Sequence, residues 1–214
     1  MRTEEVILQA ASELFDTKGF TGTSLADIMA ASGGITKGAL YHHFESKADI
    51  ARIILERQVT MSTVNLPAQT TRLQEAIDTS FAFAHLLQND AVARAGTRLS
   101  IIDRGLPDGL ARGEAIRAWL DHAELLLMQA HEAGHMVPTV KPREAAETIV
   151  GQFIGIQLTS EILHGREDLP RGISLMWRMI LPGIALPAII AGLEYGENRI
   201  NDLKLSETTS QSGS

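Results

Sequence analysis

The sequence predicts an all-α protein. Alanine, leucine and isoleucine dominate its periodic segments, and apolar residues recur three and four positions apart instead of alternating as they do in strands. Aromatic residues make up only 5% of the 214 residues, whereas 44% are hydrophobic, so a sizeable helical core is expected. Cysteine is absent, which excludes disulfides, thiolate catalysis and cysteine-ligated zinc.

The first 57 residues predict short helices with clear start and stop signals. Capping residues begin these segments and glycines end two of them, which matches the backbone requirements of helix ends. The expected helices run from Thr3 to about Gly19, from Ser24 to Gly33-Gly34, for about two turns after Thr36, and from Ser46 through Arg57.

Longer amphipathic segments follow beyond about residue 65. Prolines at positions 107, 138 and 170 mark connections between them. The expected helices cover roughly 70–88, 90–103, 112–134, 142–164 and 171–196. The last nine residues, 206–214, are polar and are expected to be disordered.

The two short helices within residues 21–49 suggest a helix-turn-helix that docks on DNA. Small residues start the second of them, and hydrogen-bond donors lie along one face. Electrostatics give this interpretation little support. The net charge is −7, and the first 50 residues hold four basic side chains against seven acidic ones. The prediction therefore depends on the pattern of residues.

That pattern resembles the N-terminal domain of the tetracycline-repressor (TetR) family. Residues 36–47 read T-K-G-A-L-Y-H-H-F-E-S-K, a long string with few other meanings, and the resemblance covers roughly residues 1–55. It implies a homodimeric, all-helical repressor that binds double-stranded operator DNA and leaves it when a small molecule binds. The implied division is a helix-turn-helix domain at 1–47, a ligand-binding and dimerisation domain at 48–205, and the tail at 206–214.

The family's DNA contacts carry over to the recognition helix and its flanks. Lysine side chains can neutralise phosphates, a glycine permits close backbone approach, and a tyrosine can meet sugar or a thymine methyl. The expected DNA-binding residues are Thr23, Ser24, Thr36, Lys37, Gly38, Tyr41, His42, His43 and Lys47. Helix capping is an alternative role for Thr36 and Ser24. Tyr41 could instead be a half-buried core residue, and His43 could be structural.

The turn departs from the family's usual spacing by one residue. The family has A-G-V-T at this point, whereas this chain reads Ser32-Gly33-Gly34-Ile35-Thr36. Two glycines can absorb the extra residue by taking positive φ angles without strain. Alternatively, the extra residue rotates the recognition helix and changes the operator that it reads.

Three further segments resemble the subgroup of the family that senses γ-butyrolactone-type signalling molecules. They are VARAGTRLS at 92–100, Trp119 within AIRAWLDHAELLL, and MWRMILPGIALP at 176–187. The resemblance implies that Trp119 lines the effector cavity and that the repressor controls antibiotic genes; a drug-sensing repressor of an efflux or catabolic gene is the alternative.

An effector pocket needs an apolar lining with a few polar anchors. Residues of both kinds occur on the predicted helices, although core packing is the alternative for each of them. The expected ligand-binding residues are Trp119, Gln58, Met61, Phe81, Leu127, Gln152, Phe153, Gln157 and Thr159. Helices 142–164 and 171–196 are also too apolar for a solvated surface, so they are expected to pair in a homodimer as a four-helix bundle.

A rival interpretation comes from His131-Glu132-Ala133-Gly134-His135, which fits the H-E-x-x-H pattern of zinc peptidases. Gly134 interrupts the motif, so the helix is expected to end at the second histidine and catalysis is not expected. We predict no metal and no cofactor.

The apolar run Met179–Leu193 is too short and too broken by proline and glycine to span a membrane, and the N-terminus resembles no signal peptide, so a cytoplasmic protein is expected.

Overall fold

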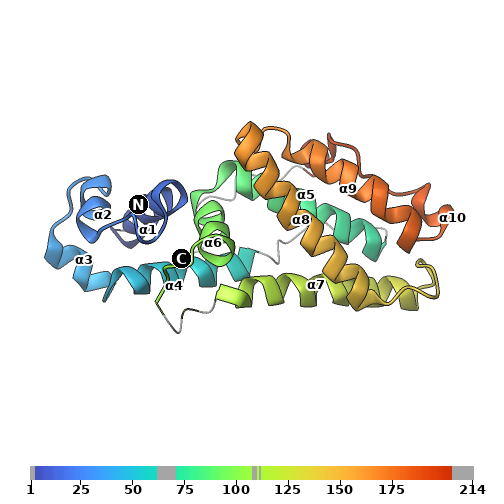
Figure 1. The fold of residues 1–214 in the computed structure, drawn as a ribbon, viewed down its shortest axis with the longest axis horizontal. Helices are drawn as coiled ribbons and strands as arrows, with labels where there is room; N and C mark the ends of the chain where they lie inside the picture. The colour runs from blue at the N-terminus through green and yellow to red at the C-terminus, as the bar shows by residue number, and fades with distance from the viewer. Residues whose placement is uncertain (1–2, 62–70, 108–109, 111, 204–214) are drawn as a thin grey trace. The chain divides into compact units, whose positions relative to one another are not determined.

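The computed structural model describes residues 3–61, 71–107, 110 and 112–203, and its regular structure is helical. The one β-bridge among these residues is isolated and joins Met136 to Ala185. The prediction of an all-α protein is therefore confirmed (Figure 1). Contacts divide the chain into two compact units, Met1–Thr63 with Leu86–Trp119, and Val64–His85 with Leu120–Ser214.

The first unit packs the N-terminal helices against α4 and α6. Its helices are α1 (Thr3–Lys18), α2 (Leu25–Ala31), α3 (Lys37–His43), α4 (Lys47–Met61) and α6 (Ala91–Ile101). Figure 1 shows α1, α2 and α3 gathered at the beginning of α4. One hydrophobic core serves all of them, and it includes Ile7, Phe15, Ile28, Leu40, Phe44, Ile54 and Leu99. Leu40 is the one fully buried residue of α3.

Local capping chemistry fixes the starts of the short helices, as the sequence predicts. Ser24 and Asp27 form the complete capping box of α2, and the hydrogen bonds from Ser24 lower the pKa of Asp27. Thr36 caps α3, because its hydroxyl accepts from the backbone N–H of Ala39 at 3.2 Å.

The second unit is built on longer helices. They are α5 (Arg72–Asn89), α7 (Arg112–Glu132), α8 (Pro142–His164) and α9 (Leu169–Ile184), followed by the short helices α10 (Pro187–Ile190) and α11 (Arg199–Asp202). Helices α5 and α7 each contribute residues to both units. The core of the second unit contains Phe81, Leu127, Phe153 and the fully buried Trp177, whose Nε1 donates to Ser80 Oγ at 2.9 Å.

The expected helix 171–196 is wrong in its second half. Helix α9 ends at Ile184, and Ala185 has extended backbone angles. Pro187 disfavours helical geometry in the residue before it, so the chain leaves the helix there. The freed backbone pairs instead with the segment after α7, where Val137 N donates to Ile184 O at 2.9 Å and Leu186 N to His135 O at 3.0 Å.

The packing units do not follow the expected domain boundary at residue 47. Helices α4 and α6 group with α1–α3, so the division into domains 1–47 and 48–205 remains a prediction about function.

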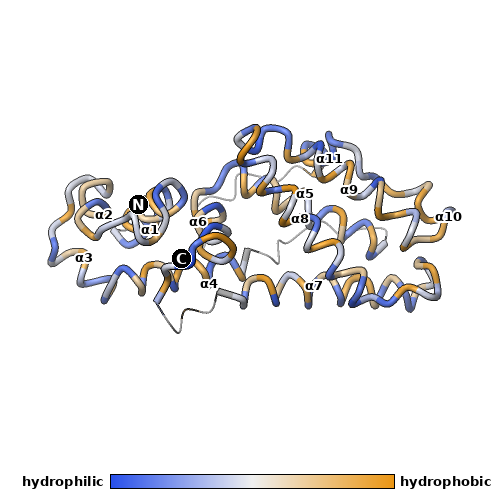
Figure 2. The backbone as a smooth tube through the Cα atoms, in the orientation of Figure 1, coloured by the Kyte–Doolittle hydropathy of each residue, from blue (hydrophilic) through white to orange (hydrophobic). Residues whose placement is uncertain are grey.

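The expected disordered tail, 206–214, lies outside the described residues. Polar and apolar residues are mixed along each of the long helices (Figure 2). Among the described helices, none combines the length and apolarity that crossing a bilayer requires.

Candidate nucleic-acid interface and effector site

The turn between α2 and α3 accommodates its extra residue through two left-handed glycines. Gly33 N donates to Ala30 O at 3.3 Å and Gly34 N to Met29 O at 3.0 Å, the hydrogen-bond pattern of a Schellman cap. Both glycines have positive φ angles, 85° and 76°, and space around them is open. Helix α2 therefore ends normally, and the second glycine carries the chain on to Thr36 without strain.

Helix α3 presents most of the predicted DNA contacts to solvent. Thr36, Lys37, Gly38, His42 and His43 are all exposed. Tyr41, at 47% exposed, is more open than a core aromatic, and the Lys37 ammonium lies 5.7 Å from its ring centroid. The His42 and His43 rings meet edge to face, with centroids 5.0 Å apart. One short helix thus exposes a cation, a phenol and two imidazoles to solvent.

Thr23 and Lys47 are engaged inside the protein. Thr23 is 2% exposed, and its hydroxyl donates to Gly19 O at 2.9 Å. The Lys47 ammonium donates to Phe20 O at 2.7 Å and Thr23 O at 2.6 Å, and it lies 4.2 Å from the centroid of the Phe20 ring. Burial lowers the pKa of Lys47. For these two residues the geometry favours support of the α1–α2 turn over contact with phosphate.

Helix α6 supports the same region through residues that the sequence interpretation missed. The Asp103 carboxylate, just past α6, accepts from Phe20 N at 2.8 Å. Arg94 Nε donates to Asp16 Oδ2 at 2.7 Å, and Arg98 Nη1 donates to Asp16 O at 3.1 Å. No local pattern signals these contacts, because their partners are about 80 residues apart in the chain. The α1–α2 turn is consequently held by both α4 and α6.

The predicted effector residues divide by burial. Phe81, Leu127, Phe153 and Gln157 lie inside the second unit, where the Phe153 ring is 5.8 Å from the ring of Phe83. Gln58 is also fully buried, but in the first unit, where its amide lies 2.9 Å from Thr97 Oγ1 and 2.8 Å from Ser100 Oγ. Hydrogen bonds within the protein thus satisfy Gln58, which favours a role in joining α4 to α6.

Three other predicted effector residues are not fully buried. Gln152 and Thr159 are exposed on α8 and line a shallow groove of about 460 Å³ beside α9, together with Gly155, Ser160 and Leu175. Trp119 is half-buried on the part of α7 that belongs to the first unit. The side chain of Met61 lies outside the described part of the chain.

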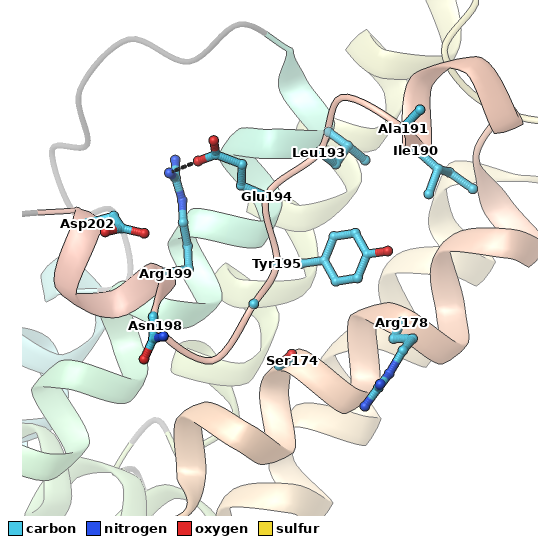
Figure 3. Close-up of a pocket in the computed structure, with 11 residues that line it drawn as sticks. Ser174, Arg178, Ile190, Ala191, Leu193, Glu194, Tyr195, Asn198, Arg199 and Asp202 are labelled. Atoms are coloured by element: carbon cyan, nitrogen blue, oxygen red, sulfur yellow. Dashed lines mark hydrogen bonds and ion pairs between the residues drawn. The ribbon is translucent and has the colours of Figure 1, made fainter.

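A second hollow, of about 620 Å³, opens beside the segment that follows α10 (Figure 3). Tyr195, Arg178 and Arg199 lie along it. Arg199 is already committed, since it pairs with the buried Asp78 at 2.8 Å and with Glu194. None of the predicted effector residues lines this hollow.

The H-E-x-x-H segment has no helical face that carries both histidines. Helix α7 ends at Glu132, three residues earlier than expected, and Gly134 takes a positive φ of 73°. His135 lies beyond the helix, where its N–H donates to Ala130 O at 3.0 Å. Within the described ranges, no group of histidines and carboxylates could hold a metal ion.

Comparison with known proteins identifies the family. Residues 7–53 match the family described as "Bacterial regulatory proteins, tetR family", and residues 70–186 match "Tetracyclin repressor-like, C-terminal domain". The chain belongs to the TetR family. The proteins of this family are transcriptional regulators, so the chain is a DNA-binding regulator and the peptidase interpretation is not supported.

Several TetR proteins are similar to this chain over most of its length. The A-factor receptor protein of Streptomyces griseus is 38% identical over 194 residues, which cover 91% of this chain and 68% of the receptor. The crystal structure of TylP, a TetR regulator from Streptomyces fradiae, has 33% identity and a TM-score of 0.82, covering 94% and 95% of the two chains. A γ-butyrolactone receptor described as ArpA-like has 29% identity and a TM-score of 0.74, with the same coverage.

Within the TetR recognition helix, Gly38 is unusual because the fold does not require it. A Cβ atom built there would meet only Thr36 Oγ1, at 4.0 Å. Gly38→Ala should therefore keep or raise the free energy of unfolding, by up to about 1 kcal/mol. It should weaken operator binding about fivefold if DNA approaches the backbone here. Thermal unfolding and fluorescence anisotropy of labelled DNA measure the two effects. Unchanged affinity would mean that this backbone stays away from the DNA.

Proposed function

We propose that the chain is a homodimeric repressor that a γ-butyrolactone, a furan or a similar small apolar signal releases from operator DNA, controlling antibiotic or other secondary-metabolite genes. The single observation that supports this most is the similarity to the A-factor receptor protein across 91% of the chain. The similarity extends through the effector domain, which is the part that diverges most among regulators with different ligands. A cytoplasmic location fits this role.

The DNA half of the proposal depends on α3. Its exposed Lys37 and Tyr41 lie on one helical face, where a cation can meet phosphate and a phenol can meet sugar or base. Ser24, Thr36, His42 and His43 are also accessible. With one accessible lysine on this helix, backbone amides and hydroxyls must supply much of the remaining attraction.

The effector half depends on the second unit and on the similarity to a γ-butyrolactone receptor. Phe81, Leu127 and Phe153 give the interior of this unit an apolar character that suits an uncharged ligand. Trp119 remains a proposed lining residue through its resemblance to the subgroup.

Dimerisation is proposed through α8 and α9. Large apolar side chains are exposed there: Ile162 is 78% exposed, Leu163 65%, Leu175 46% and Met179 72%. A solvated surface rarely exposes so many apolar groups together, and a matching face on a second copy would cover them.

Binding to the gene's own upstream DNA tests the proposal. An electrophoretic mobility shift with purified protein should appear at modest ionic strength and disappear when an acylated γ-butyrolactone is added. A shift that only hydrophobic drugs reverse would favour a drug-sensing repressor of an efflux or catabolic gene. A shift that no small molecule reverses would contradict the effector half.

A further inference from the structure

One buried polar side chain of the second unit differs from all the others that the structure describes there. Gln157 on α8 is 1% exposed, and neither its nitrogen nor its oxygen has a hydrogen-bond partner among the described residues. The unit's other described buried polar side chains each have at least one partner. They are Gln74 with Asp78, Asp78 with Arg199, Ser80 with Trp177, Ser160 with Asp168, and Arg166 with Glu161.

Gln157 occupies an inward-facing stripe of α8 in which the buried residues before it are all apolar and the next one, Ser160, is polar. One turn before it on α8 lies Phe153, which packs against Phe83 of α5. The stripe continues with Ile149 and Val150, both buried. An apolar residue at position 157 would suit these apolar neighbours. An amide there loses its hydrogen bonds to water and gains none from the residues that the structure describes, so it destabilises the ligand-free fold.

The buried glutamine of the first unit shows the contrasting case. Gln58 is as deeply buried as Gln157, yet Thr97 and Ser100 of α6 reach both ends of its amide. A Cβ atom at Gly96 would lie 2.8 Å from Gln58 Cβ, so the neighbouring helix leaves just enough room for this side chain. The protein itself explains Gln58. For Gln157, none of the residues that the structure describes supplies a partner, which leaves its amide available to a ligand.

We propose that Gln157 is the polar anchor of the effector, an inference that depends on the proposed function. Its nitrogen would donate to a carbonyl oxygen of the ligand, and its oxygen would accept from a ligand hydroxyl. The buried charges of the unit are paired with each other, as Asp78 with Arg199 and Arg166 with Glu161. The site therefore suits an uncharged molecule with both an acceptor and a donor, such as a hydroxylated lactone.

Two variants and two probes test this assignment. The probes are a γ-butyrolactone that carries an acyl chain and a hydroxymethyl group, and its analogue with methyl in place of hydroxymethyl. Gln157→Leu should need about tenfold more lactone for release from the gene's upstream DNA, because the anchoring hydrogen bonds are lost. Wild-type protein should distinguish the two probes by a similar factor, and Gln157→Leu should not distinguish them.

Thermal unfolding without ligand gives an independent readout. Gln157→Leu should unfold at the same or a higher temperature, because it removes an unpaired amide, whereas Gln58→Leu should unfold at a lower one. If the lactone releases wild type and Gln157→Leu equally well, this inference fails while the proposed function stands. A lowered unfolding temperature for Gln157→Leu would have the same meaning. If the lactone fails to release the wild type, the proposed effector class fails, and this assignment fails with it.

Discussion

Replacing Lys47 with methionine should weaken operator binding about thirtyfold and leave the salt dependence of binding unchanged. The ammonium donates to two backbone carbonyls of the α1–α2 turn and lies over the Phe20 ring, and methionine keeps only the apolar part of the side chain. A charge-assisted hydrogen bond contributes about 1.5–3 kcal/mol, so the free energy of unfolding should fall and α2 should be held less firmly in place. Fluorescence anisotropy at several salt concentrations, with urea unfolding alongside, measures this.

The salt dependence distinguishes support from direct contact. A lysine that neutralises one phosphate contributes about 0.9 to the slope of log affinity against log salt concentration. Lys47→Met should keep the wild-type slope and lose about 2 kcal/mol in the free energy of unfolding. A slope reduced by about 0.9, with stability unchanged, would instead place Lys47 against the DNA.

Replacing Asp78 with asparagine should lower the free energy of unfolding by about 3–5 kcal/mol. Asp78 is fully buried on α5, and its two oxygens accept from Arg199 Nε and Nη2 at 2.8 Å each. Gln74 joins the network, donating to Asp78 at 2.8 Å and accepting from Glu194 N at 2.8 Å. The variant leaves a largely buried guanidinium with only the exposed carboxylate of Glu194 as its charged partner, which should loosen the segment around α11. Urea unfolding gives the value.

Arg72→Ala provides a control on the same helix. Arg72 pairs with Glu75 on the exposed side of α5, where ion pairs contribute about 1 kcal/mol or less. Replacing Asp78 and Arg199 together by leucine should cost less than Asp78→Asn alone, because no unpaired charge stays buried. A loss below 1 kcal/mol for Asp78→Asn would show that the segment around α11 does not depend on this pair.

Features that depend on neighbouring residues could be predicted from the sequence. The Ser24–Asp27 box and the Thr36 cap involve partners three residues apart, and the structure has both. Gly33 and Gly34 take the positive φ angles that their extra position in the turn requires. The recognition helix and its exposed face follow from this local chemistry.

Features that depend on distant partners could not be predicted. Lys47 fits a phosphate contact by spacing alone, but its carbonyl partners lie 24 and 27 residues earlier in the chain. Gln58 and Gln157 look alike in sequence, since both are amides on apolar helical faces. The packing of α6 against α4 supplies partners for Gln58, whereas no described residue supplies one for Gln157 on α8. The early end of α9 likewise depends on backbone pairing with residues near Met136.

The salt dependence of operator binding by Lys37→Ala tests the central claim most directly, that the exposed face of α3 docks on DNA. Lys37 is exposed, and its ammonium lies near the Tyr41 ring, so the fold does not depend on it. Fluorescence anisotropy with the gene's own upstream DNA should give weaker binding and a slope lower than wild type by about 0.9, at an unchanged unfolding temperature. An affinity and a slope equal to those of the wild type would contradict docking through this helix.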